Sequence, residues 1–287
     1  MSANHAAFNL IFRFVENYIS PIAGRISSQR HVMAIRDGFI SAMPFMIVGS
    51  FLLVFAYPPF SPDTTWGFAR AWLDLAKEFE GRILTPFDMT MGIMSIYICA
   101  AISYNLGKHY EKSNQLDPFM CAMLSIMAFL LIAAPKTNGT LPVDSLGGTG
   151  IFTAILVAIY CVEMMRFLKA HNIGIRLPDQ VPPMIKNSFD LLIPVLVVVL
   201  TLYPLSLFIQ HHFDMLIPQA IMAIFKPLVS AADSLPAILL AVLIGHLLWF
   251  AGIHGAAIVS GMLQMFWLTN LGMNQSALAQ GDRKSVV

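Results

Sequence analysis

Long, uninterrupted apolar runs dominate the pattern of this chain. Six of them approach or reach the length that a helix needs to cross a hydrocarbon core, roughly 20 residues. They cover residues 38–57, 89–106, 119–134, 150–166, 191–210 and 236–254, of which the third is short for a full span. Strands of a membrane β-barrel would alternate in hydrophobicity instead. The pattern predicts an all-α, polytopic integral membrane bundle of about six transmembrane helices.

Composition supports this class of protein. The chain is 57% hydrophobic and 11% charged, with a mean hydropathy of +0.71. Soluble domains carry about a quarter charged residues, because charge covers their water-facing surface. This chain has too little charge to cover such a surface. We therefore expect the lipid bilayer as its surroundings and no nucleic acid as its partner.

Loop charges orient the bundle. Basic residues concentrate in alternate segments, as the positive-inside rule requires of cytoplasmic loops. We therefore expect a multi-pass membrane protein with a cytoplasmic N-terminus and a cytoplasmic loop at 167–190. The inside residues would be Arg13, Arg25, Arg30, Arg36, Lys108, Lys112, Arg166, Lys169, Arg176 and Lys186, against Arg70, Lys77, Arg82, Lys136 and Lys226 outside.

The first 36 residues show no cleavable signal peptide, because no small-residue cleavage site follows an apolar core. Residues 8–26 mix apolar and polar positions, which fits an amphipathic helix at the inner interface; a partly ordered tail is the alternative. The three cysteines fall within apolar runs and lack metal-site spacing. We expect no metal and no cofactor.

Polar residues at membrane depth are costly and are often functional. His246 and His254 lie in the sixth run, eight residues apart, so they share roughly one helix face. Gly252 and Gly255 flank His254, and a helix broken there would expose polar backbone to a substrate. Trp249 could stack on an apolar ring face. The alternative is a histidine bonded to a carbonyl beside two packing glycines.

Two loops carry unusual chemistry. Asn138 belongs to an Asn-Gly turn on the expected outer side, and its amide could contact a polar substrate or simply form the turn. The loop 175–190 holds Pro178, Pro182 and Pro183, so it is not helical throughout. It is either a stiff linker that sets the start of the fifth helix, or a docking surface or gate.

Three motifs together resemble a known family. They are Ala-Ile-Arg-Asp-Gly-Phe-Ile at 34–40 with Met-Pro at 43–44 and Val-Gly-Ser at 48–50; Leu-Pro-Asp-Gln-Val-Pro at 177–182 with Ser-Phe at 188–189 and Leu-Ile-Pro at 192–194; and Leu-Trp-Phe-Ala-Gly-Ile-His-Gly at 248–255. In this order they resemble the lactose/cellobiose/diacetylchitobiose family of enzyme IIC permeases. That family belongs to the phosphoenolpyruvate-dependent sugar phosphotransferase system, so the resemblance implies residence in a bacterial inner membrane.

The resemblance implies a mechanism. Such permeases are homodimers that bind a β-linked disaccharide and carry it inward. A IIB protein, phosphorylated on cysteine, then phosphorylates the sugar's 6-hydroxyl, while the permease itself is not the phosphorylated subunit. The motif assigns a catalytic role to His254, near that hydroxyl, and a substrate-binding role to Trp249 and His254. Asn138 is our further candidate for a sugar contact.

The resemblance also implies a division of the chain. We expect an interfacial segment at 1–36, a scaffold with the dimerisation helices at 37–212, and the start of the sugar-transport half at 213–287. Members continue with a hairpin that bears an essential glutamate, and 280–287 matches none of their segments. From the sequence we expect a truncated chain with little or no sugar binding alone. A non-transporting assembly module and a proton-coupled carrier remain alternatives.

Overall fold

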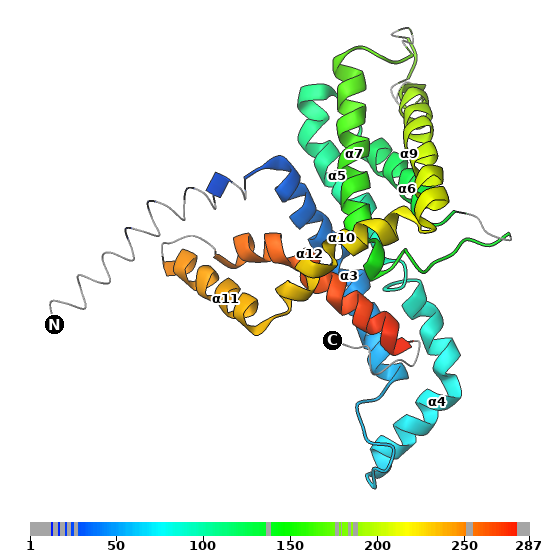
Figure 1. Ribbon diagram of the computed structural model, residues 1–287, viewed down its shortest axis with the longest axis vertical. Helices are drawn as coiled ribbons and strands as arrows, with labels where there is room; N and C mark the ends of the chain where they lie inside the picture. The colour runs from blue at the N-terminus through cyan, green and yellow to red at the C-terminus, as the bar shows by residue number, and fades with distance from the viewer. Residues whose placement is uncertain are drawn as a thin grey trace.

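The computed structural model describes residues 13, 17, 21, 24–25, 28–135, 139–175, 178, 180–182, 185, 189–250 and 255–279. Within these residues the chain is α-helical (Figure 1). The α-helices are α3 (Arg30–Ala56), α4 (Gly67–Asp88), α5 (Met94–Asn114), α6 (Pro118–Ala133), α7 (Ile151–Ala170), α9 (Leu192–Phe213), α10 (Ile217–Ala232), α11 (Leu235–Phe250) and α12 (Gly255–Ala279). A short 3-10 helix, η2 (Gly148–Gly150), precedes α7.

Helix α5 forms the centre of the core. It packs against α3, α6 and α7, and Met94, Ile98, Ile102 and Leu106 on it are fully buried. Small residues let the neighbours approach closely. A side chain at Gly38 of α3 would lie 2.8 Å from the backbone nitrogen of Ile102. Close packing of this kind is a main source of helix association in a bilayer, where lipid is as apolar as the helices themselves.

The helices around α5 alternate in direction, and this gathers basic residues at one end. At this end α3 begins, α5 and α7 end and α9 begins. Glu163 of α7 accepts hydrogen bonds there from His31 and Tyr110, and Lys169 contacts Gln115 and Asp190. We call this the basic end. The half of each helix toward it carries Arg30, Arg36, Lys108, Lys112, Arg166 and Lys169.

Of the C-terminal helices, α12 packs against α3, α10 packs against α7 and α12, and α11 packs against α12 (Figure 1). Helices α10 and α11 form a pair bent by 71° at a short break. Helix α12 crosses the second half of α3, where the Gln275 amide donates to Ser50 Oγ at 2.8 Å. The Tyr57 hydroxyl, just after α3, contacts both Glu80 of α4 and the Ala279 carbonyl of α12. This contact joins three helices at the end opposite the basic end.

The expectation of an all-helical membrane protein is confirmed. Three described stretches are long and apolar enough to cross a membrane: Arg30–Ala56, Gly148–Ala170 and Leu192–Phe213. The bent pair α10–α11 adds a fourth if it counts as one broken span, and α6 is a shorter apolar helix. Helix α5 does not join them, because its second half carries Lys108, His109, Glu111 and Lys112.

Three helices were not predicted from the sequence. Helices α4 and α10 are amphipathic, so their apolar residues lie on one face and form no continuous run. On α4, for example, Ala69, Ala76 and Phe87 are buried while Arg70 and Lys77 are exposed. Helix α12 is interrupted by polar residues such as Thr269, Asn270 and Gln275. A search for unbroken runs overlooks all three.

The approach of α3 to α5 gives a first testable prediction. Gly38→Ala forces a methyl group against the Ile102 backbone, so we expect it to destabilise the protein by about 1–3 kcal/mol. Gly81→Ala is the matched control, because nothing lies within 4 Å of a methyl group at Gly81. There a helical alanine should be neutral or stabilising by up to about 1 kcal/mol. The thermal unfolding midpoints of the two variants in detergent, monitored by size-exclusion chromatography, make the comparison. Equal midpoints would contradict this packing.

Candidate functional site

The site predicted from the sequence lies where α11 ends and α12 begins. Trp249 is in the last turn of α11 with 54% of its surface exposed, next to the fully buried Leu248. Residues 251–254, which include His254, and residues 136–138, which include Asn138, lie outside the described residues. The structure therefore places Trp249 at a helix end, immediately before the segment that carries His254.

His246 and His212 have partners on their own helices. His246 Nδ1 lies 2.8 Å from the Val242 carbonyl, one turn earlier on α11. His212 Nδ1 lies 3.0 Å from the Phe208 carbonyl in the same way, in the exposed last turn of α9 with His211. Each ring thus contacts its own helix backbone. A contact of this kind is common for a histidine near an apolar segment and needs no functional role. Among the described residues, His246 has no contact with a group that could relay a proton.

The strongest polar cluster among the described residues is at the basic end, and the sequence assigned it no role. Glu163 on α7 accepts from His31 Nε2 at 2.9 Å, from the Tyr110 hydroxyl at 2.7 Å and from Arg166 at 2.6 Å. The Gln29 amide faces His31 Nδ1 at 3.1 Å, which fits a neutral ring with its proton on Nε2. One carboxylate therefore joins the start of α3 to the ends of α5 and α7.

Cationic side chains complete this cluster. The guanidinium groups of Arg30 and Arg166 lie 5.5 and 5.0 Å from the centre of the Tyr110 ring. Cations at this distance are attracted by the negative face of an aromatic ring. Glu163 is the centre of the cluster. Its partners come from segments about 50 and 130 residues away, so no local pattern reveals them.

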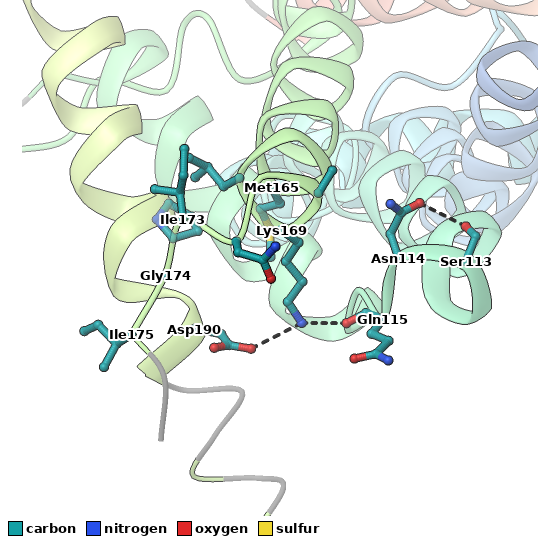
Figure 2. A pocket seen from close by; sticks show the side chains of 13 residues that line it. Ser113, Asn114, Gln115, Met165, Lys169, Ile173, Gly174, Ile175 and Asp190 are labelled. Carbon is teal, nitrogen blue, oxygen red and sulfur yellow. Dashed lines mark hydrogen bonds and ion pairs between the residues drawn. The ribbon is translucent and has the colours of Figure 1, made fainter. Parts of the chain in front are cut away.

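A cavity of about 770 Å³ lies beside this cluster, between the ends of α5 and α7 and the start of α9 (Figure 2). Lys169 lies at its centre, where its ammonium donates to the Gln115 carbonyl at 2.6 Å and pairs with Asp190 at 3.2 Å. Ser113, Asn114 and Asn172 add hydroxyl and amide groups. The volume falls within the range of small-molecule sites, about 300–1,000 Å³.

Comparison with known proteins identifies the class of this fold. The sequence profile of the family described as "Phosphotransferase system, EIIC" matches residues 36–286. The structure superposes with a TM-score of 0.80 on the crystal structure of the transporter ChbC, the IIC component of the N,N'-diacetylchitobiose-specific phosphotransferase system. The two are 33% identical, and the match covers 94% of this chain and 64% of that one. The fold is thus that of a IIC transporter, a membrane permease.

Curated relatives agree. The cellobiose-specific EIIC component of Geobacillus stearothermophilus is 33% identical over 285 residues, which cover 93% of this chain and 61% of that protein. The lactose-specific EIICB component of Streptococcus mutans is 32% identical over 273 residues, or 93% of this chain and 46% of that protein. The chain belongs to the EIIC family of the phosphotransferase system, as its motifs indicated. It spans about three fifths or less of these relatives' length.

The Glu163 cluster gives a second prediction. Glu163→Gln keeps the shape of the side chain but removes the charge that faces His31, Tyr110 and Arg166. We expect a loss of about 1–3 kcal/mol of stability, because these bonds are charge-assisted. Glu111→Gln is the matched control, since Glu111 is exposed near the end of α5. Thermal unfolding midpoints in detergent measure both; a Glu163→Gln midpoint as high as that of the control would show that the cluster adds no stability.

Proposed function

We propose that the permease containing this chain binds a β-linked disaccharide and carries it inward for phosphorylation by a phosphorylated IIB protein. The observation that carries the proposal is the family match over residues 36–286. Relatives over nearly the whole chain are named for cellobiose, lactose and N,N'-diacetylchitobiose. All three sugars are β-linked disaccharides. The chemistry of the family is group translocation, in which the sugar is trapped as a charged phosphate.

In this proposal His254 and Trp249 form part of the sugar site. The indole of Trp249 offers an aromatic face at the end of α11, and such faces suit the apolar side of a sugar ring. A neutral imidazole at position 254 orients the sugar's 6-hydroxyl or accepts its proton. The phosphorus–sulfur bond to the IIB cysteine then breaks as the oxygen–phosphorus bond to the sugar forms. Asn138 is proposed as a further sugar contact.

We further propose that the basic end faces the cytoplasm. Support comes from the clustering there of six basic residues that the sequence places inside: Arg30, Arg36, Lys108, Lys112, Arg166 and Lys169. On this orientation α3, α5, α6, α7, α9 and the α10–α11 pair make six crossings. Helices α5 and α6 then cross within protein, because their neighbours cover most of their surface.

The proposal also assigns a role to each part of the chain. Residues 37–212 form the scaffold and the dimerisation helices, residues 1–36 an interfacial segment, and residues 213–287 the start of the transport half. Helices α3, α5, α6 and α7 share one core cluster, which suits a rigid scaffold. Helices α10 to α12 carry the bend and the sugar motif, which suits a part that moves.

The orientation is tested by cysteine labelling at Gln180, in the loop between α7 and α9. The background replaces Cys99, Cys121 and Cys161, all buried, by alanine. We expect Gln180→Cys to resist a membrane-impermeant maleimide in intact cells and to react once the membrane is opened. Asp63→Cys, in the loop between α3 and α4, should react in intact cells. Labelling of position 180 from outside would contradict the topology.

The role of His254 is tested in the full reading frame that contains this chain. We expect His254→Ala to lower phosphorylation-coupled disaccharide uptake by about 100-fold or more, the usual contribution of a positioned acid or base. His211→Ala is the control, because His211 lies in the exposed last turn of α9. It should change uptake by less than about twofold on the same scale.

Folding is checked separately for both variants by chromatography in detergent. A well-folded His254→Ala protein that transports and phosphorylates at the normal rate would exclude His254 from the site.

A further inference from the structure

The cavity at the basic end carries both signs of charge on its wall. Figure 2 shows Lys169 reaching from the last turn of α7 toward the Gln115 carbonyl on one side and the Asp190 carboxylate on the other. An ammonium has three N–H donors. Among the described residues two of them are directed to Gln115 and Asp190, so the third can serve a ligand in the cavity. Lys169 is the one cation among the described lining residues.

Negative potential surrounds this cation. Helices α5 and α7 both end at the cavity, and each is followed by a left-handed residue, Gln115 and Asn172, with φ of 54°. The carbonyl end of a helix carries about half a negative charge. The start of α9 opposes them with about half a positive charge, so the two helix ends and the Asp190 carboxylate together still favour a positive group. The wall thus matches a ligand that carries one anionic and one cationic group close together.

The position of the cavity in the bundle further limits the kinds of ligand that could bind there. It opens beside α7 and α9, both long and apolar enough to cross a membrane, at the end where α7 carries Arg166 and Lys169 and where Asp190 precedes the apolar start of α9. Ile173 and Ile175 contribute exposed apolar side chains to its lining. Leu192, at the start of α9, is exposed as well. An apolar rim around a charged pocket at a helix end is the environment of a lipid headgroup.

We propose that this cavity binds the ethanolamine phosphate headgroup of a phospholipid in the leaflet at the basic end. The phosphate accepts from the Lys169 ammonium, and the primary ammonium donates to Asp190 and to the carbonyl ends of α5 and α7. A choline headgroup has no N–H to donate, and a glycerol headgroup has no positive charge to offer. The site should therefore prefer the primary amine. This inference stands apart from the proposed sugar transport.

The test uses the protein in nanodiscs that contain equal amounts of phosphatidylethanolamine, phosphatidylcholine and phosphatidylglycerol. After release into detergent, native mass spectrometry counts the lipids that stay bound. We expect phosphatidylethanolamine to be retained about tenfold over phosphatidylcholine, the effect of one or two charge-assisted bonds. Lys169→Met and Asp190→Asn should each remove this preference. Lys112→Met and Glu111→Gln, at exposed positions on α5 outside the cavity, should keep it.

A second measurement needs no variant. A phosphatidylethanolamine that carries a photoreactive group near the headgroup should crosslink the wild-type protein at residues 165–175 or 190–194. Crosslinks confined to other segments would overturn the assignment, as would equal retention of the three lipids. Soluble glycerophosphoethanolamine carries the same headgroup without acyl chains, so it distinguishes a membrane lipid from a free ligand. Binding of that molecule with no phosphatidylethanolamine retained would overturn the assignment to a lipid.

Discussion

The close contact of α3 with α5 is the constraint on which the rest of the structure depends. Gly38 leaves no room for a side chain against the Ile102 backbone of α5, and Gly49 leaves none against Met91 in the turn that precedes α5. These two contacts, about three turns apart on α3, hold α3 close to α5 and to the turn before it. With α5 fixed in this way, its other faces are free to bury α6 and α7. The arrangement of the core helices is therefore determined by the shapes of their surfaces, and not by a contrast between polar and apolar faces.

The buried polar groups of this core also leave the association of the helices to packing. Ser103 and Ser125 are fully buried, and each hydroxyl donates to the carbonyl one turn earlier on its own helix. Such bonds satisfy the hydroxyl without binding a neighbour, so the helices remain held by packing. Bonds between helices occur at mid-helix, where the Tyr160 and Thr201 hydroxyls of α7 and α9 lie 2.6 Å apart, and also at the helix ends. Glu163 joins three helices at the basic end, and Tyr57 joins three at the opposite end.

The sequence predicted the apolar helices well and the amphipathic ones not at all. The runs at 119–134 and 191–210 correspond to α6 and α9 within three residues at each end. Helix α4 was missed because its core-facing residues, such as Ala69 and Ala76, are separated by charged ones. The charge pattern of the loops has a physical basis in this fold, and the orientation drawn from it stays a prediction. Helices that alternate in direction bring alternate loops to one end.

The site was less accessible to sequence reasoning. The roles assigned to Trp249, His254 and Asn138 all stay predictions, and of the three only Trp249, at the end of α11, lies within the described residues. The polar features that the structure adds, around Glu163 and Lys169, depend on contacts between separate helices. Glu163 contacts residues at positions 31 and 110, and Lys169 contacts residues at 115 and 190. The spacing of residues along a single helix does not reveal such a cluster.

Under the proposed function, the sugar crosses the membrane by group translocation. The most direct measurement follows radiolabelled cellobiose into membrane vesicles that contain the full permease, with and without phosphorylated IIB protein on the cytoplasmic side. The account predicts that label accumulates as the sugar phosphate and only when phosphorylated IIB is present. Accumulation of the free disaccharide without IIB, driven by a proton gradient, would contradict it and would favour a proton-coupled carrier.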